Sequence, residues 1–308
     1  MWSRFRPHGD SIVPPAGMTS EVKPLAPGWH LYGNDRSPQT PFDVGVVMPT
    51  MGRDSILEAV SSVYAQQNCG RIQLLIGVDV PNGDFTRLQA MLAAAPDHVT
   101  PCLFYPGYST SVRHGGLHPA GDGGVLRSVL SYLANARHLA YLDDDNWWAP
   151  GHLTSLLHAV RGREWAFGLR WFVHPQSRQP VCVDGWESVG PGRGDFISKF
   201  GGWVDPNCLM IDKLACEPVL RWWTIPLPGN PRGMSADRHV YDWLQRKSVP
   251  GETGVASVYY MMQPMDGNHQ HRLNRMGQRY AAASTVRNAQ GAGQANSSMP
   301  SSSIGRVP

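Results

Sequence analysis

Residues 138–147 read HLAYLDDDNW, an apolar run followed by three consecutive aspartates. Its first half, His138–Leu142, is a short and mostly apolar run of the kind that forms a buried strand, and three aspartates follow it directly. Adjacent carboxylates repel one another, so in an apolar setting they need a cation or hydrogen bonds to offset the repulsion. Asp143-Asp144-Asp145 therefore indicates a site for Mg²⁺ or Mn²⁺, with a solvated acidic turn before the next helix as the alternative. The position at the end of a strand favours the metal.

Apolar runs typical of strands alternate with helical spacing from this stretch back towards the amino terminus. Apolar runs predict strands at 44–48, 72–78 and 99–105, and helical spacing is found at 56–63, 85–94 and 125–135. Strands that alternate with helices predict an α/β fold, with a mostly parallel central sheet, helices on both faces and a single large domain. Ligands bind beyond the carboxyl ends of such strands, so the polar groups at Pro49-Thr50, Asp79 and the acidic triplet are expected to converge there.

Composition sets the limits of the domain and of its partners. Residues 1–42 are rich in Pro and Gly and predict an irregular leader, and 281–308 form a Ser-, Ala- and Gly-rich stretch that predicts a flexible tail. Between them, 43–280 carry the domain. With 42% hydrophobic residues the chain can bury a core, which excludes wholesale disorder. The net charge of +3 is too small to indicate nucleic acid or an anionic membrane as the main partner.

The five cysteines include no C-x-x-C pair, a pattern that fits neither a disulfide framework nor a zinc ribbon. A reducing, cytoplasmic location is the simplest interpretation. The first residues lack the apolar core of a secretory signal, and no stretch approaches the roughly 18 apolar residues that a membrane span requires. Attachment to a membrane-bound partner stays open.

Four segments together resemble the family-2 glycosyltransferases of the GT-A fold. They are VGVVMPTMGR at 44–53, LLIGVDVPNGD at 74–84, GDGGVLRSVLSYLANARHLAYLDDDNW at 121–147 and SADRHVYDWL at 235–244. The resemblance covers roughly 43–265 and implies a GT-A-like, Rossmann-like sheet. It also implies a nucleotide-binding half at 43–147 and an acceptor and catalytic half at 148–280. The expected activity is transfer of a sugar from a nucleotide-diphosphate sugar to an acceptor hydroxyl.

For the donor, the resemblance implies a set of nucleotide-sugar-binding residues. They are Pro49, Thr50, Arg53, Asp79, Arg127, Asp143 and Asp144. The cation, Mn²⁺ or Mg²⁺, would be held by Asp145 together with Asp143. Asp79 can accept the N3–H of uracil and Arg127 can approach its carbonyl edge, which makes UDP the favoured nucleotide. As an alternative, Asp79 before Pro81-Asn82-Gly83 is also a common turn residue.

For the acceptor, the resemblance implies that Asp237 is the general base of an inverting, single-displacement reaction. The family has a glutamate at the preceding position, where this chain has Ala236. Trp203 and Asp205 lie in a segment that loosely resembles the acceptor side. Asp237 could instead be an ordinary acid in the first turn of a helix. A saccharide or another hydroxyl compound is the expected acceptor.

Two further groups of residues are candidates for binding. His269 and His271 are spaced so that both would face the same way on an extended segment, and many relatives of this fold add a histidine from this region to the metal site. An exposed polar loop is the alternative. Several tryptophans could stack on sugar rings, although core packing is the commoner role. They are Trp147, Trp148, Trp203, Trp222 and Trp223.

Two other classes of protein have to be weighed. A sugar-1-phosphate nucleotidyltransferase has a related sheet, but its first loop is rich in glycine and contains lysine, whereas residues 49–53 read PTMGR. A non-catalytic scaffold that binds a sugar or a nucleotide is favoured by Ala236 and opposed by the intact acidic triplet and Asp237. The leading hypothesis is a metal-dependent glycosyltransferase.

Overall fold

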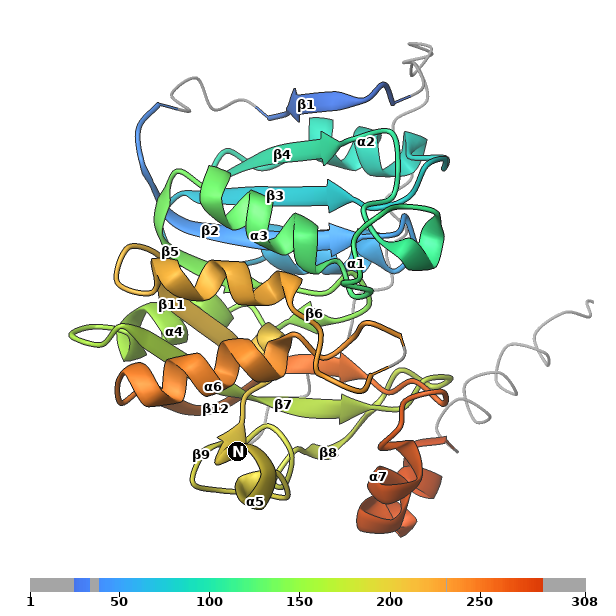
Figure 1. The fold of residues 1–308 in the computed structure, drawn as a ribbon, viewed down its shortest axis with the longest axis vertical. Helices are drawn as coiled ribbons and strands as arrows, with labels where there is room; N and C mark the ends of the chain where they lie inside the picture. The colour runs from blue at the N-terminus through green and yellow to red at the C-terminus, as the bar shows by residue number, and fades with distance from the viewer. Residues whose placement is uncertain (1–24, 34–38, 231, 285–308) are drawn as a thin grey trace, which may run out of the picture.

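A computed structural model describes residues 25–33, 39–230 and 232–284 (Figure 1). Ten strands form one mixed sheet, in the order β1-β4-β3-β2-β5-β11-β7-β12-β6 with β8 paired to β7. Its strands are β1 (Gly28–Leu31), β2 (Phe42–Thr50), β3 (Ile72–Val78), β4 (Val99–Tyr105), β5 (Ala136–Tyr141), β6 (Trp147–Trp148), β7 (Trp165–Val173), β8 (Pro180–Val183), β11 (Leu209–Asp212) and β12 (Gly251–Met261). A separate two-stranded sheet pairs β9 (Gly190–Pro191) with β10 (Gly202–Trp203).

Helices cover both faces of the large sheet. They are α1 (Ile56–Tyr64), α2 (Thr86–Ala93), α3 (Gly124–Leu133), α4 (His152–Ala159), α5 (Ile197–Phe200), α6 (Asp237–Lys247) and α7 (His269–Met276), with shorter 3₁₀ turns η1 (Val112–His114), η2 (Pro206–Cys208) and η3 (Glu217–Thr224). In Figure 1, α3 and α6 lie in front of the sheet and α1 lies behind it. The predicted α/β fold class, a central sheet with helices on both faces, is therefore confirmed.

The amino-terminal half of the sheet follows the sequence closely. β4, β3, β2 and β5 pair in parallel, and every residue of β3 is buried, as expected for a strand with helices on both sides. The predicted strands at 72–78 and 99–105 match β3 and β4 residue for residue. The acidic triplet begins two residues after β5 ends at Tyr141.

The order of these strands positions the site. The chain runs outward from β2 to β3 and β4, and then returns through α3 to β5 on the other side of β2. The sheet therefore has a topological switch point between β2 and β5, which is where ligands bind in open α/β sheets. Thr50 at the end of β2 and Asp144 just beyond β5 meet at this point, with the Thr50 hydroxyl donating to the Asp144 carboxylate at 2.6 Å.

The carboxyl-terminal half is mixed and adds antiparallel strands. β11 lies between β5 and β7 and runs antiparallel to both, and β12 runs parallel to β7. Helix α6 packs on this half through Val240, Tyr241 and Leu244, which are buried. Trp165 on β7 meets Tyr241 edge to face, with ring centroids 6.3 Å apart.

The two ends of the chain differ from the expectation where the structure describes them. Strand β1 lies within the predicted irregular leader and extends the sheet by pairing antiparallel with β4. Residues 281–284, the described part of the predicted flexible tail, are helical. The rest of both predictions, 1–24 and 285–308, lies outside the described residues. Within the described part of the chain, no helix has the length and apolarity of a membrane span.

Candidate functional site

The acidic triplet is held by arginines from two directions. Arg53, on the loop after β2, lies 2.9 Å from Asp144 and 2.7 Å from Asp145. Arg127, on α3, pairs with Asp143. Two guanidiniums thus face three carboxylates, which leaves one negative charge in excess. The prediction that polar groups from separate strand ends converge is confirmed for Thr50 and the triplet, and Arg53 joins them.

Burial shifts the protonation of the triplet. It raises the pKa of Asp145 to about 6, with the negative charges of Asp143 and Asp144 acting in the same direction and Arg53 opposing them. Burial also raises the pKa of Asp144, whereas the charge of Arg53 and the hydrogen bond from the Thr50 hydroxyl lower it. The site therefore retains a negative field that a cation or a protonated group would relieve.

The donor atoms fit a divalent cation held by a single protein carboxylate. Both oxygens of Asp143 accept from protein donors, Arg127 and Asn207, and both oxygens of Asp144 are paired as well. Asp145 uses Oδ2 towards Arg53 and Gln263, while its Oδ1 has no donor among the described residues. Across the same residues, no group of three His, Cys, Asp or Glu side chains is arranged to hold a metal. Mg²⁺ and similar ions are commonly held by one or two carboxylates plus substrate phosphates, and Asp145 meets that requirement.

Asp79, at the end of β3, is buried and holds a neighbouring loop. Its carboxylate accepts from the backbone N–H of Thr110 at 2.5 Å and from the hydroxyls of Thr110 and Ser109 at 3.2 Å each. The side chain therefore fixes the loop that follows β4. A nucleotide base that paired with Asp79 would share this carboxylate with Thr110.

The glycine-rich turn before α3 packs on the end of β2. Gly123 has φ 73°, and a Cβ at this position would lie 2.7 Å from Cβ of Pro49, so the turn requires glycine there. Next to it, Oδ2 of Asp122 accepts from the backbone N–H groups of Ser235, at 3.1 Å, and Ala236, at 3.4 Å. Arg127 also donates to the carbonyl of Asp122 at 2.5 Å. This turn thus connects the acidic triplet with the start of α6.

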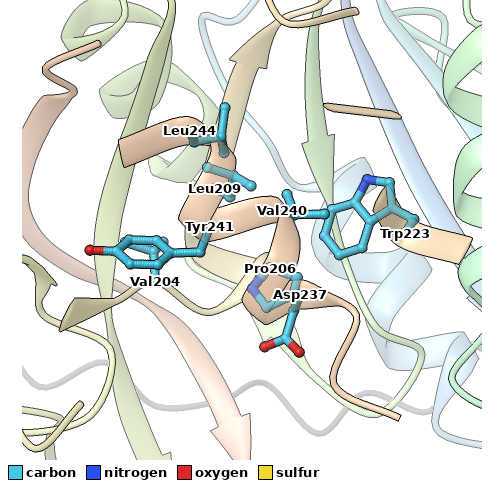
Figure 2. Close-up of a pocket in the computed structure, with 8 residues that line it drawn as sticks. All are labelled: Val204, Pro206, Leu209, Trp223, Asp237, Val240, Tyr241 and Leu244. Carbon is cyan, nitrogen blue, oxygen red and sulfur yellow. The ribbon is translucent and has the colours of Figure 1, made fainter. Parts of the chain in front are cut away.

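Asp237 is the first residue of α6, and 18% of its side chain is exposed. The indole N–H of Trp203 donates to its Oδ2 at 3.0 Å. Burial raises the pKa of Asp237, with Arg238 opposing the shift and the nearby charge of Asp122 adding to it. In Figure 2 its carboxylate lies at the end of an apolar row that includes Val240 and points away from that row. The carboxylate is thus an oriented group with a raised pKa, as a general base requires.

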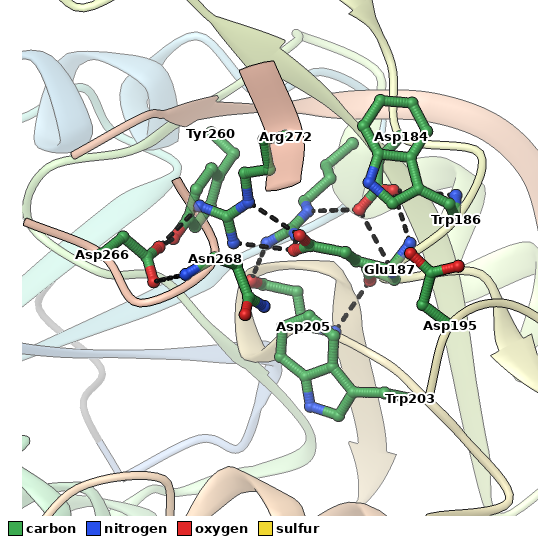
Figure 3. A network of polar contacts seen from close by, with 12 residues as sticks. Asp184, Trp186, Glu187, Asp195, Trp203, Asp205, Tyr260, Asp266, Asn268 and Arg272 are labelled. Atoms are coloured by element: carbon green, nitrogen blue, oxygen red, sulfur yellow. Dashed lines mark hydrogen bonds and ion pairs between the residues drawn. The ribbon is translucent and has the colours of Figure 1, made fainter. Parts of the chain in front are cut away.

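Asp205 has a different environment from the one expected for an acceptor residue. It is 3% exposed and pairs with Arg170, which is fully buried and also binds Asp184 at 2.8 Å and Glu187 at 2.7 Å. Figure 3 shows Asp205 inside this network, where Arg272 binds Glu187 through two nitrogens. Buried charges that are all paired in this way fix the local geometry.

Asn207 links that network to the acidic triplet. Its side-chain amide donates to Asp143 at 2.9 Å and to Asp205 at 2.6 Å, and its side-chain oxygen accepts the backbone N–H of Asp143 at 2.7 Å. Neither Asn207 nor Asp122 was among the residues expected from the sequence to form the site. Asp122 stands in the GDGG turn that carried the resemblance, whereas nothing near Asn207 in the sequence indicates its role.

The two histidines lie at the start of α7, on the lower right of Figure 1. His271 is 2.7 Å from Asp195 and so pairs with a loop of the carboxyl-terminal half. Nδ1 of His269 is buried without a partner among the described residues. Neither histidine forms part of a group of three metal-binding side chains in the described chain. The expected extended segment is a helix here, so the two rings do not face the same way.

The tryptophans divide between core and surface. Trp148, Trp203 and Trp223 are buried, which is the core role weighed against stacking. Trp147 stacks on Tyr259, with ring centroids 5.5 Å apart. Trp222, by contrast, lines an open groove beside α6.

The sequence matches no protein-family model, and no curated protein matches it significantly. Solved structures do match it by fold. Residues 1–349 of S. aureus TarS in complex with UDP-GlcNAc superpose with a TM-score of 0.52 at 11% identity, covering 79% of this chain and 70% of that one. The same fragment with UDP gives a TM-score of 0.51 at 12% identity, covering 76% of this chain and 64% of that one. This chain spans 38% of a longer TarS structure. At such identities the likeness establishes the fold, a GT-A-type glycosyltransferase fold.

Proposed function

We propose that the chain is a metal-dependent, inverting glycosyltransferase of the family-2 type that uses a nucleotide-diphosphate sugar. The observation that carries this proposal is the continuous chain of contacts from Asp143 through Arg127 and Asp122 to the start of α6. Through it, the candidate cation site and the candidate base, Asp237, belong to one connected group at the switch point of the sheet. The fold shared with a UDP-bound structure of TarS supports the same class of activity.

On the donor side, Thr50, Arg53 and the triplet would face the diphosphate, and Asp79 and Arg127 the nucleotide. A bound Mn²⁺ or Mg²⁺ would offset the negative charge that develops on the leaving diphosphate. Asp145 is the side chain with a carboxylate oxygen free to hold the cation. UDP remains the favoured nucleotide, because a carboxylate such as that of Asp79 can accept the N3–H of uracil. In this pose Asp79 would share its carboxylate between the base and Thr110.

On the acceptor side, Asp237 would take the proton of the attacking hydroxyl as the new glycosidic bond forms. Trp203 would hold the carboxylate in place through its indole N–H. In the proposed single displacement the acceptor hydroxyl attacks the anomeric carbon directly as the nucleotide diphosphate leaves, so the configuration at that carbon inverts. A cytoplasmic location and a saccharide or other hydroxyl compound as the acceptor remain predictions from the sequence.

The proposal is tested by replacing Asp237 with Asn. We expect Asp237→Asn to keep its affinity for UDP and to lose transfer and hydrolysis of UDP-sugars by about 10²-fold or more. Glu252→Gln is the control, because Glu252 is a half-exposed carboxylate that pairs with Arg193. Full turnover in Asp237→Asn would contradict the assignment of the base. Nucleotide binding without turnover in the native chain would favour a non-catalytic scaffold.

A further inference from the structure

A groove of about 320 Å³ lies between η3 and the outer side of α6. It is lined by Trp222, His239, Asp242, Trp243, Arg246 and Lys247. Its volume falls at the lower end of the range of about 300–1,000 Å³ found for small-molecule sites. The proposed transferase function gives this groove no role.

The groove is separate from the candidate reaction centre. The five lining residues on α6 recur at spacings of three and four, so they occupy one face of the helix. The opposite face carries Val240, Tyr241 and Leu244, which are buried against the sheet in line with Asp237. A ligand in the groove would therefore lie across the helix from the candidate base.

The rim of the groove carries charged side chains, and their charges are paired with one another or with a neighbouring carboxylate. Arg246 pairs with Asp242 at 3.0 Å, and Lys247 lies 3.4 Å from Glu164. A phosphate or another anion would have to compete with these carboxylates for the cations. An uncharged hydroxyl can instead donate to the carboxylates and accept from the N–H groups while the ion pairs stay in place. The rim thus favours a neutral polar ligand.

The side chains that line the groove include two indoles and a histidine ring with one nitrogen that has no hydrogen-bond partner among the described residues. Two indole side chains, Trp222 and Trp243, line the groove, and the His239 ring lies 5.7 Å from that of Trp222. Nε2 of His239 is buried and has no hydrogen-bond partner in the described part of the chain. A buried polar atom without a partner costs free energy, and a ligand hydroxyl would recover it once a rotation of the imidazole turns Nε2 towards the groove.

We propose that this groove binds an uncharged saccharide, as a second site apart from the reaction centre. A sugar ring combines an apolar C–H face, which packs on an indole, with a rim of hydroxyl groups, which matches Asp242, Arg246 and His239. The proposal does not depend on the transferase function, because binding at this site requires neither nucleotide nor metal.

The test is a titration of the full chain, labelled with ¹⁵N at tryptophan, without nucleotide or metal. The probes are cellohexaose, maltohexaose, chitohexaose and mannohexaose, and the signals followed are the indole N–H resonances. We expect at least one probe to shift the resonances of Trp222 and Trp243. Trp222→Ala should weaken that binding by roughly tenfold, the loss of one stacking contact. Trp29→Ala, which removes an exposed indole on β1, should leave it unchanged.

A second variant, Arg246→Ala, keeps the test informative if Trp222→Ala does not fold. The Arg246 side chain is 77% exposed, so Arg246→Ala should fold normally and still weaken binding severalfold. The proposal is overturned if none of the probes shifts these two resonances, or if both variants bind as the native chain does. It is also overturned if UDP or inorganic phosphate shifts them and the oligosaccharides do not.

Discussion

The indole N–H of Trp203 donates to Oδ2 of Asp237 at 3.0 Å, and the guanidinium of Arg238 lies 3.8 Å from the centroid of the same indole. A cation over the ring face holds the indole by a cation–π interaction, and the indole in turn orients the carboxylate. Trp203 therefore acts as a positioning residue for the proposed base, which it stabilises in the charged form. The sequence analysis had assigned Trp203 to the acceptor side.

This relationship predicts a shift in the pH dependence of transfer. The hydrogen bond from Trp203 lowers the pKa of Asp237 against the larger effect of burial, so Trp203→Phe should raise it. Because the base acts unprotonated, the acid limb of the kcat/KM profile should move to higher pH.

The control for this profile is Trp171→Phe, since the indole N–H of Trp171 donates to the carbonyl of Ala256 and to no carboxylate. Its acid limb should match that of the native chain. An unchanged acid limb in Trp203→Phe would show that the indole does not act on the protonation of Asp237.

Arg53 is predicted to compete with metal for Asp145. Its guanidinium occupies Oδ2 of Asp145 at 2.7 Å, so Arg53→Ala should strengthen Mn²⁺ binding in the absence of nucleotide. The expected gain is about tenfold, equivalent to one exposed charge-assisted hydrogen bond. Titration of Mn²⁺ by calorimetry measures it, with Arg87→Ala as control because Arg87 pairs on the surface with Asp54. Weaker metal binding in Arg53→Ala would mean that Arg53 supports the cation.

Arg170 is predicted to be essential for stability. It is fully buried and pairs with Asp184, Glu187 and Asp205, so Arg170→Met would leave buried carboxylates without their cation. Loss of one partner from such a group costs about 3–5 kcal/mol of unfolding free energy. Urea unfolding measures this loss. Arg193→Ala, which breaks an exposed pair, should cost less than about 1 kcal/mol, and a similarly small loss in Arg170→Met would contradict the account.

His271 is predicted to have no part in donor binding. It pairs with Asp195 at 2.7 Å, which fastens α7 to the neighbouring loop. His271→Ala should therefore change metal-dependent UDP affinity by less than about twofold, because an exposed ion pair contributes little free energy. Calorimetric titration of UDP with Mn²⁺ tests this, and a loss as large as that in Asp145→Asn would make His271 a metal ligand after all.

Local signals in the sequence were sufficient for the amino-terminal half of the fold. The apolar runs that became β2, β3, β4 and β5 are short, separated by turn residues and buried on both faces, so each could be predicted without knowledge of its partners. Because parallel strands end at a common edge, the meeting of Thr50 with the acidic triplet could be predicted from the same pattern.

The rest of the site depends on contacts between distant residues. Asn207 binds Asp143, which lies 64 positions earlier, and Arg170 pairs with three carboxylates from two later segments. The carboxylates of Asp184 and Glu187 show no periodicity in the sequence that would mark them as buried. Such networks follow from the packed fold, whereas the sequence shows only the types of residue available.

In the proposed function, Asp145 and a divalent cation together create a site for a nucleoside diphosphate. The most direct measurement is a calorimetric titration of UDP into the native chain with Mn²⁺, into the same chain with EDTA, and into Asp145→Asn with Mn²⁺. The account predicts binding in the first case and a loss of about 10²-fold or more in the other two, as charge pairing with the diphosphate disappears. Equal UDP affinity in all three titrations would contradict it, and so would the absence of binding by UDP, GDP, TDP and CDP when Mn²⁺ is present.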